Sequence, residues 1–236
     1  MNKFKVLLAI LALMTCVKIG TYKSESYLRS RVVQLTGDKR GSCSGVQVHA
    51  PSGEDYILSA AHCSILADEY GNINVRLDDT RFIKRRIVEL SKDTDLMLLE
   101  GMPNLKGLSI AKKYKIGQHV RSLTHGAGLD TYKTEGELIQ VSIIEVLNNI
   151  IKTQEDELAC SLPKNKIKTI ETIFGEFKVC LISFEAFVST AKVVPGSSGG
   201  AIIDDKGNLI GIVSAGDETF GIFVTNDAIN EFLSAY

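Results

Sequence analysis

Three short segments of this chain hold residue types that together could hydrolyse an acyl bond. His62 closes one apolar segment, Asp95 opens another, and Ser198 stands directly before two glycines. Acyl transfer to water needs a nucleophile, a base that takes the proton of the nucleophile, and a carboxylate that orients the base. It also needs backbone N–H groups that point at the developing oxyanion, and glycine permits the backbone conformations that bring such groups together. The joint occurrence of these segments in the order His, Asp, Ser predicts nucleophilic catalysis.

The elements that must position these residues have the pattern of β-strands. Short apolar segments, many of them alternating with polar residues, recur along the chain and are bounded by Gly, Asn, Asp or Ser. About a dozen such segments at short spacing favour an all-β sandwich or barrel. The expected strands cover residues 32–35, 46–49, 56–60, 74–77, 82–90, 96–100, 119–123, 138–146, 178–183, 201–203, 209–214 and 221–225.

Three weaker patterns complete the organisation of the chain. Lysines at 164, 166 and 168 recur with period two around Ile167, which suggests a strand with one solvated face. Asn226 or Asp227 can cap a helix that closes the chain. Residues 126–130 are rich in turn formers, and they predict a turn between two halves.

The length and composition are those of a packed globular protein. The chain has 236 residues, of which 44% are hydrophobic and 23% are charged, so it forms one large domain or two small ones. These values exclude a disordered chain, a collagen and a polytopic membrane protein. The formal net charge is -1, so no overall field draws the chain to nucleic acid or to acidic lipid. We therefore expect no nucleic-acid partner.

The N-terminal segment is typical of an export signal. Two lysines precede an apolar run over residues 6–17, which suits a signal-peptide core and is shorter than the roughly 20 residues that a transmembrane helix needs. Three fates stay open for residues 1–26: cleavage near the small residues 24–26, lipidation at Cys16, and retention as a membrane tether. All three place the protein outside the cytoplasm, in the periplasm or secreted. An exported chain with four cysteines beyond this segment is expected to form two disulfides.

The motifs around the three candidate residues resemble those of trypsin/chymotrypsin-fold serine proteases. The sequence AAHC at 60–63 and the sequence GSSGG at 196–200 carry the resemblance, which runs from about residue 30 to the C-terminus. Residues 116–120, 134–139 and 205–212 are more similar to the bacterial high-temperature-requirement type than to digestive trypsins. The resemblance therefore covers most of the chain and rests on motifs that are specific to this superfamily.

The resemblance implies a fold for residues 27–236. It implies two six-stranded antiparallel β-barrels with the active site in the cleft between them. We expect the N-terminal barrel over about 27–125, the C-terminal barrel over about 126–225 and the closing helix over 227–236.

The same resemblance implies a role for each candidate residue. His62 is the expected general base, Asp95 the acid that orients it, and Ser198 the nucleophile. The backbone N–H groups of Gly196 and Ser198 are the expected oxyanion hole. We expect neither a metal ion nor a cofactor, because no cluster has the spacing of metal ligands.

Two of these assignments have a competitor nearby. Asp93 could take the place of Asp95, but the acid of the family directly precedes the apolar strand, as Asp95 does. Ser197 could take the place of Ser198, but only Ser198 is followed directly by the glycine pair. The other histidines lack such a context and are expected to be ordinary residues of the fold: His49, His119 and His125.

The cysteines agree with the resemblance. The family often places a partner for the cysteine after its histidine where Cys43 stands, which implies a Cys43–Cys63 bridge beside His62. Cys160 and Cys180 then remain for the second bridge, ahead of the nucleophile in the second barrel.

The chain also departs from the family in several places. Digestive zymogens carry Asp directly before the nucleophile, whereas this chain has Ser197, so activation by a freed N-terminal amine is not expected. High-temperature-requirement proteases usually add a PDZ domain, and we expect none after the closing helix. Lys192 stands where trypsin has its specificity Asp, and it would either favour acidic substrates or point outward. Val193, Val194 and Phe220 suggest a pocket for small or apolar side chains.

These observations predict an exported serine endopeptidase that cleaves proteins or peptides through an acyl-enzyme. A non-catalytic binding module on the same fold is the main alternative, although pseudo-proteases typically lose a triad member and this chain has lost none. A membrane-tethered processing protease with one dedicated client is a third hypothesis, supported by the apolar residues 6–17. The sequence makes no prediction of the oligomeric state.

Overall fold

The computed structural model describes most of the chain beyond the N-terminal segment. The described residues are 23–37, 41–91, 93–128, 131–150, 160, 165–172 and 175–236. The expected leader or tether over residues 6–17 lies outside them. Within the described ranges, no helix has the length and the apolar character needed to cross a membrane.

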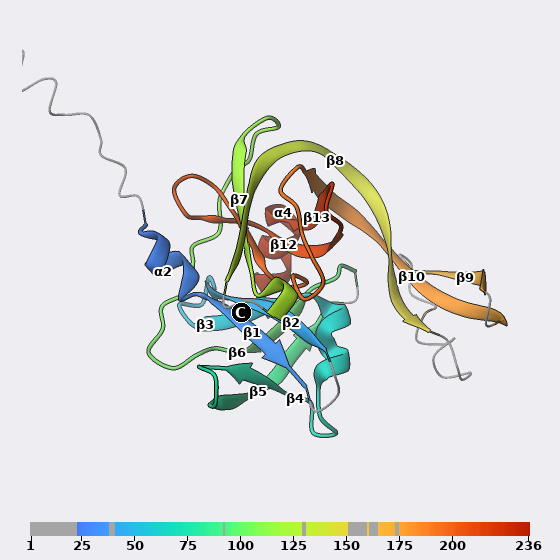
Figure 1. Ribbon diagram of the computed structural model, residues 1–236, viewed down its shortest axis with the longest axis horizontal. Helices are drawn as coiled ribbons and strands as arrows, with labels where there is room; N and C mark the ends of the chain where they lie inside the picture. The colour runs from blue at the N-terminus through green and yellow to red at the C-terminus, as the bar shows by residue number, and fades with distance from the viewer. Residues whose placement is uncertain are drawn as a thin grey trace, which may run out of the picture.

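The first half of the chain forms a closed antiparallel barrel (Figure 1). Its strands follow the order β1-β2-β3-β6-β5-β4 around the barrel. Side chains of β4 alternate between buried and half-buried positions, as expected for a strand with one face in a core. The bounds are β1 (Val32–Thr36), β2 (Ser42–His49), β3 (Asp55–Ser59), β4 (Asn72–Arg76), β5 (Phe82–Leu90) and β6 (Met97–Glu100).

The second half forms a seven-stranded sheet in the order β13-β12-β11-β7-β8-β10-β9. An additional pairing joins β13 to β10, so the six strands other than β9 close into a second barrel. The bounds are β7 (His119–Thr124), β8 (Tyr132–Ile150), β9 (Asn165–Thr172), β10 (Gly175–Ser189), β11 (Ala201–Ile203), β12 (Leu209–Gly216) and β13 (Gly221–Thr225). The all-β fold with two antiparallel barrels is thereby confirmed.

Two strands of the second barrel continue beyond it as an arm. Residues 186–189 of β10 pair with β13 and close the barrel, whereas residues 175–182 pair with β9. The other edge of β10 pairs with β8 along nearly its whole length. Figure 1 shows β8, β10 and β9 leaving the barrels together. Large apolar side chains of this arm are exposed, and Ile143 is 80% exposed.

The two barrels pack against each other through one continuous apolar core. Buried residues of the first barrel, among them Leu58 and Leu98, belong to the same cluster as Phe184 and Ile212 of the second. The connecting chain supports this contact, because it bridges to β2 at Leu108 and to β12 at Ile110. A rigid junction of this kind allows the two barrels to contribute different residues to one site.

Two helices cover the junction. The C-terminal helix α4 (Asn226–Leu233) begins at Thr225, whose hydroxyl accepts a hydrogen bond from the Ala228 N–H, and its buried face joins the shared core. The short helix α2 (Glu25–Arg29) places Leu28 in that core. Helix α2 crosses the expected boundary between residues 26 and 27, so residues 23–26 fold with the domain.

Two expectations about organisation are corrected. The barrel boundary near residue 125 is wrong, because β7 pairs with β8 and β11 and belongs to the second barrel. A turn between two halves was predicted over residues 126–130, but the described part of it, residues 126–128, follows β7 within the second barrel. Residues 129 and 130 lie outside the described residues. The expected strands 138–146 and 178–183 are parts of longer strands. Strand β8 begins six residues earlier, in the mostly polar sequence YKTEGE, and β10 continues through residues 184–189, which pair with β8 and, from residue 186, with β13.

Candidate active site

His62 lies where β3 leaves the first barrel. The strand ends at Ser59, and the 3₁₀-helix η1 (Ala61–Leu66) turns the chain so that the imidazole lies at the barrel junction. Cys63 is fully buried, and its disulfide to Cys43 ties η1 to β2. The backbone N–H of His62 donates to Asp95 Oδ1 at 3.0 Å. Backbone and cross-link together fix the position of this side chain.

Asp95 holds the His62 ring in a defined state. Its carboxylate is 4% exposed, and Oδ2 lies 2.8 Å from His62 Nδ1. Oδ2 also accepts a hydrogen bond of 2.6 Å from the Ser214 hydroxyl. An ionised carboxylate only accepts hydrogen bonds, so Nδ1 carries the proton and Nε2 is left with a free lone pair.

Asp95 also sets the proton affinity of His62. Burial by itself lowers the pKa of His62, but the hydrogen bond from the ring to Asp95 and the negative charge of Asp95 outweigh it. The pKa of His62 is therefore raised above its ordinary value. The neutral ring is therefore a stronger proton acceptor than a free imidazole, and it accepts a proton once the pH has risen above this raised pKa.

Ser198 stands on a loop between the barrels. Its carbonyl accepts a hydrogen bond of 2.7 Å from the Ser44 N–H of β2, and the next residue, Gly199, donates to the Val213 carbonyl at 2.7 Å. Gly199 has φ +82°, and a Cβ there would lie 2.1 Å from Ser44 O and from Ser59 Oγ. Only glycine fits this close approach.

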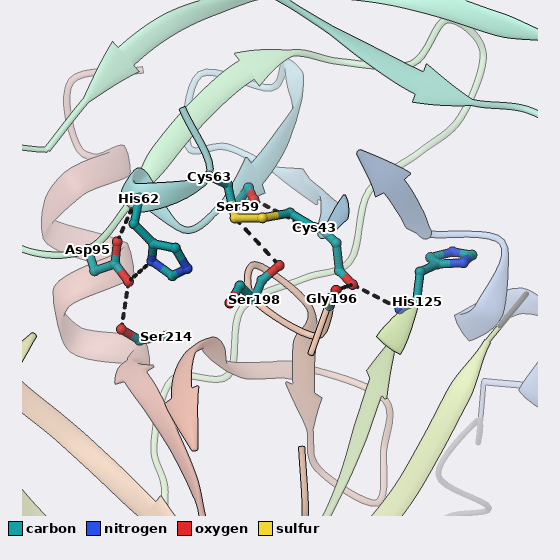
Figure 2. Close-up of a disulfide and its surroundings, with 10 residues drawn as sticks. Cys43, Ser59, His62, Cys63, Asp95, His125, Gly196, Ser198 and Ser214 are labelled. Atoms are coloured by element: carbon teal, nitrogen blue, oxygen red, sulfur yellow. Dashed lines mark hydrogen bonds and ion pairs between the residues drawn. A yellow bond between two sulfur atoms is a disulfide. The ribbon is translucent and has the colours of Figure 1, made fainter. Parts of the chain in front are cut away.

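The His62 ring lies between Asp95 and Ser198, as Figure 2 shows. Within the described residues, no hydrogen bond joins Nε2 to the Ser198 hydroxyl. Such contacts are often long in unliganded enzymes and shorten in the substrate complex. Cys63 Sγ lies 3.8 Å from the Ser198 carbonyl, and this is a packing contact because a disulfide sulfur carries no proton.

The loop before Ser198 forms a tight turn. Ser197 N–H donates to the Val194 carbonyl at 2.9 Å, with Pro195 and Gly196 as the central residues and Gly196 at φ +89°. Proline followed by a residue of positive φ is the pattern of a type II turn. In the described part of the chain, the backbone N–H groups of Gly196 and Ser198 donate to no other group, so both are free to bind an anion.

The two competitors have other surroundings. Asp93 is exposed, whereas Asp95 contacts His62. Ser197 is 1% exposed, and its hydroxyl is bonded to Thr124 Oγ1 and accepts from the Val194 N–H. Ser197 therefore supports the loop with its hydroxyl, and Asp93 is not the carboxylate that contacts His62.

A cavity of about 320 Å³ opens beside Ser198. Lys192 and Phe220 do not line it; the Lys192 side chain is exposed, and its carbonyl accepts from the Thr134 hydroxyl at 2.7 Å. The acidic residues that line the cavity are Asp217 and Glu218. The lining residues are Val193, Val194, Pro195, Ser197, Ser198, Val213, Ala215, Gly216, Asp217 and Glu218.

Sequence reasoning missed two residues of this site. Ser214 holds Asp95, and Ser44 contacts the nucleophile loop through both its backbone and its side chain. Each lies in a mostly buried strand, Ser44 in β2 and Ser214 in β12. A buried hydroxyl needs a partner, so such a serine signals a contact, although the sequence does not say with which residue.

The three other histidines lie apart from this cluster or support it through the backbone. His49 pairs with Asp55, and His119 with Asp205, while the His125 backbone N–H donates to Ser44. Among the described residues, no group of three or more His, Cys, Asp and Glu side chains could hold a metal ion.

Comparison with known families agrees with this geometry. A family model of the trypsin-like peptidase domain matches residues 43–212, which is more than half of the chain. The chain belongs to the trypsin-like peptidase family. It is accordingly a serine-type endopeptidase, as the resemblance in the sequence implied. A search of curated protein sequences finds no match.

Solved structures share the fold of this trypsin-like peptidase. The active form of the Rv3671c protease from M. tuberculosis is 18% identical, with a TM-score of 0.60 over 86% of this chain and 78% of that one. The HtrA-type protease AlgW with a tripeptide is 23% identical, with a TM-score of 0.61 over 90% and 63%. A serine endoprotease from Yersinia pestis is 18% identical, with a TM-score of 0.58 over 90% and 66%. The fold is that of an HtrA-like catalytic domain.

Proposed function

We propose that this trypsin-like peptidase cleaves peptide bonds with Ser198 as nucleophile, His62 as general base and Asp95 as the residue that orients the base. The single observation that carries the proposal is the partly buried contact of 2.8 Å between His62 Nδ1 and Asp95 Oδ2 on the side of the ring away from Ser198. This contact leaves Nε2 unprotonated toward the serine, as a general base requires.

In the acylation step, Ser198 Oγ attacks the carbonyl carbon of the substrate while its proton moves to His62 Nε2. Asp95 stays ionised and stabilises the imidazolium that forms. His62 then gives this proton to the leaving amine, and the C–N bond breaks to leave an acyl-enzyme. Water, with its proton taken by His62, hydrolyses the ester and restores Ser198.

The oxyanion of each tetrahedral intermediate is proposed to accept hydrogen bonds from the Gly196 and Ser198 N–H groups. These donors are supported by the turn at Val194–Ser197, which leaves both N–H groups without another acceptor. Donors fixed before the reaction stabilise the developing charge without reorganisation, and removal of one such donor commonly costs about 10²–10³ in kcat.

The cavity beside Ser198 favours a substrate side chain that is small or medium-sized and apolar. Val193, Val213 and Ala215 are among its lining residues. A Cβ at Gly216 would lie 2.5 Å from Val193 Cγ2, so no side chain occupies that wall. The exposure of Lys192 argues against selection of acidic side chains through this residue.

Two disulfides favour a location outside the cytoplasm. Cys43 pairs with Cys63 and Cys160 with Cys180, as expected from the sequence. Disulfides persist mainly in oxidising compartments. We propose that the enzyme works in the periplasm or as a secreted protein.

A fluorophosphonate probe tests the proposal. We expect it to label wild-type protein at Ser198, as located by mass spectrometry of the labelled peptide, and to leave Ser198→Ala unlabelled. Ser197→Ala removes the competing nucleophile and should still be labelled at Ser198. The matched control is Ser122→Ala, which removes another buried hydroxyl and should be labelled at Ser198 at the wild-type rate. Labelling at another residue would contradict the proposal. A profile on a peptide library would then show whether apolar residues are preferred on the N-terminal side of the cleaved bond.

A further inference from the structure

We propose that three buried hydroxyl groups, those of Ser44, Thr124 and Ser197, are positioning residues that hold the Pro195–Gly196 peptide in the orientation needed for an oxyanion hole. All three residues are at most 1% exposed. The inference rests on the proposed function, because it assigns these hydroxyls a part in the work of the Gly196 N–H.

Ser44 holds the carbonyl of Gly196. The Ser44 hydroxyl accepts a hydrogen bond of 2.8 Å from the His125 N–H. Its single proton is then donated to the Gly196 carbonyl at 2.9 Å. The Ser44 N–H also donates to the Ser198 carbonyl, so this residue of the first barrel holds the loop at two carbonyls, on either side of Ser197.

Thr124 and Ser197 form a second connection, from strand β7. The two hydroxyl oxygens lie 3.0 Å apart. Thr124 Oγ1 accepts from the Gly126 N–H at 3.2 Å, and Ser197 Oγ accepts from the Val194 N–H at 3.2 Å. The pair therefore satisfies two backbone donors. It links the turn after β7 to Val194, at the start of the loop that leads to Ser198.

The turn after β7 also fixes the peptide directly. Ala127, which has φ +55°, donates its N–H to the Pro195 carbonyl at 2.8 Å. In a trans peptide the carbonyl and the N–H point in opposite directions, so the Gly196 N–H points away from Ala127. A Cβ at Gly126 would lie 2.6 Å from Ser197 Oγ, so the two segments approach as closely as only glycine permits.

Rotation of the Pro195–Gly196 peptide would turn its carbonyl toward the anion site and remove the donor. The bond from the Ala127 N–H opposes this rotation directly at the Pro195 carbonyl. The hydroxyl bonds at the Gly196 carbonyl and the Val194 N–H fix the residues on either side of that peptide. Loss of a hydroxyl leaves a buried partner unsatisfied, which favours rearrangement of the loop. Because the Gly196 N–H acts mainly on the charged intermediate, loosening it should lower kcat and leave KM nearly unchanged.

The test compares Ser44→Ala, Thr124→Val and Ser197→Ala in the full chain. Two assays are used: hydrolysis of a peptide amide and inhibition by a matching peptide trifluoromethyl ketone. In the inhibited complex, Ser198 adds to the ketone carbon, its proton passes to His62, and the ketone oxygen becomes the oxyanion. We expect each variant to lose roughly 10- to 100-fold in kcat with KM within about threefold, and the inhibition constant to rise in proportion to the loss in kcat.

Two controls make the test specific. Ser122→Ala removes a hydroxyl from the same strand β7, and this buried oxygen has no hydrogen-bond partner in the described structure, so its kcat should stay within about threefold of wild type. Thr124→Ser keeps the hydroxyl and should restore the activity lost in Thr124→Val. Thr124→Val combined with Ser197→Ala should be no worse than about the more damaged single variant, because both remove one connection.

The inference would be overturned if the three variants matched Ser122→Ala in kcat, or if their losses lay wholly in KM. Thermal unfolding shows whether each variant folds, and a variant that does not fold is left out. The remaining variants and the comparison of Thr124→Val with Thr124→Ser then decide the outcome. Failure of the proposed function has a different signature. In that case Ser198→Ala keeps its activity, whatever the hydroxyl variants do.

Discussion

The two disulfides differ in what they hold. Cys43–Cys63 joins β2 to η1 inside the first barrel, one residue from His62. Cys160–Cys180 reaches β10 in the half that pairs with β9, in the arm beyond the second barrel. Both bridges span 20 positions, so the chain-entropy estimate gives each about 3 kcal/mol through the unfolded state. The two disulfides should thus stabilise the protein to a similar extent, although one lies beside His62 and the other lies in the arm.

The barrels differ in the same way in their contributions to the site. The first barrel supplies the proposed base, His62, and the proposed orienting acid, Asp95, which are fixed by backbone bonds, a disulfide and burial. The second supplies the proposed nucleophile, Ser198, on a loop of glycines and serines that is held by hydrogen bonds to both barrels. A rigid cross-link suits a residue that must keep its orientation, and a hydrogen-bonded turn suits backbone donors that must meet a substrate.

The largest effect is expected from the loop of the second barrel. Ser198→Ala should lower the rate of peptide hydrolysis by about 10⁶-fold, because the covalent route is lost. Circular dichroism and thermal unfolding should match wild type, since the half-buried hydroxyl donates no hydrogen bond in the described structure. Substantial hydrolysis by Ser198→Ala would move the nucleophile elsewhere, with Ser197 as the first suspect.

The next effect tests the first barrel through pH. His62 must be neutral to act as a base, and its pKa is raised by Asp95 against the opposing effect of burial. The value of kcat/KM should therefore rise through one ionisation that lies above the ordinary value of about 6.5. His62→Ala should abolish this limb and nearly all of the rate. A full rate at about pH 5 would contradict the assignment.

Stability should change in the opposite direction through the same ionisation. A group whose pKa is raised on folding stabilises the folded state below its unfolded pKa, and this contribution is lost as the pH rises through the folded pKa. The free energy of unfolding of wild type relative to His62→Ala should therefore fall over the pH range in which activity rises. Chemical denaturation at a series of pH values measures this difference.

The parts of this site that the sequence predicted are those with local signals. His62, Asp95 and Ser198 each stand in a motif or at a strand boundary. The family pattern implied the Cys43–Cys63 pairing, and Cys160 and Cys180 were the cysteines that remained. Ser214 and Ser44 carry no such signal, because their partners lie 119 and 152 positions away along the chain. Which buried serine meets which acceptor depends on how the two barrels pack.

The dependence on distant partners also explains the errors in the fold that the sequence predicted. Strand β8 begins in polar sequence that has no alternation, and it is a strand because β7 and β10 supply its hydrogen bonds. The pairing partners of β7 lie in the second barrel, and nothing in residues 119–124 themselves distinguishes the two barrels. The alternation of apolar residues and the turn residues locate strands in the sequence. The hydrogen bonds to neighbouring strands decide to which barrel a strand belongs and how long it is.

Removal of each disulfide would sharpen the comparison between the two barrels. Cys43→Ser with Cys63→Ser should lower the free energy of unfolding by about 2–4 kcal/mol and should also lower kcat/KM by roughly tenfold or more, because η1 loses its attachment to β2. Cys160→Ser with Cys180→Ser should reduce stability but leave kcat/KM within about threefold. Urea unfolding and peptide hydrolysis measure the two effects.

Equal losses of activity in the two double variants would contradict the separation of the arm from the site. Non-reducing peptide mapping of wild type provides the control, and it should recover both links. A fragment joining Cys43 to Cys160 or Cys180 would be inconsistent with the positions of these residues in the two barrels.

The smallest effect concerns the N-terminus. In trypsin-like zymogens a freed amine pairs with a buried Asp beside the nucleophile, but here Ser197 occupies that position and its hydroxyl is already bonded to Thr124 and Val194. An ammonium drawn to this site would lose its hydration without gaining a partner, at a cost of roughly several kcal/mol. Residues 23–25 are instead fixed elsewhere, because Lys23 Nζ donates to the Gly207 carbonyl and Glu25 pairs with Arg121.

Protein that starts at Lys23 behind a removable tag should therefore hydrolyse peptides at once. Removal of the tag should change kcat/KM by less than about threefold, which corresponds to under about 1 kcal/mol in the barrier. Activity that appears only after a cleavage exposing one particular N-terminus would show that Ser197 and its partners do not hold the loop by themselves. Activity that appears only on addition of a peptide would show instead that the loop is ordered by a ligand, and the hydroxyl contacts to Ser44 and Thr124 would then have to form in that complex.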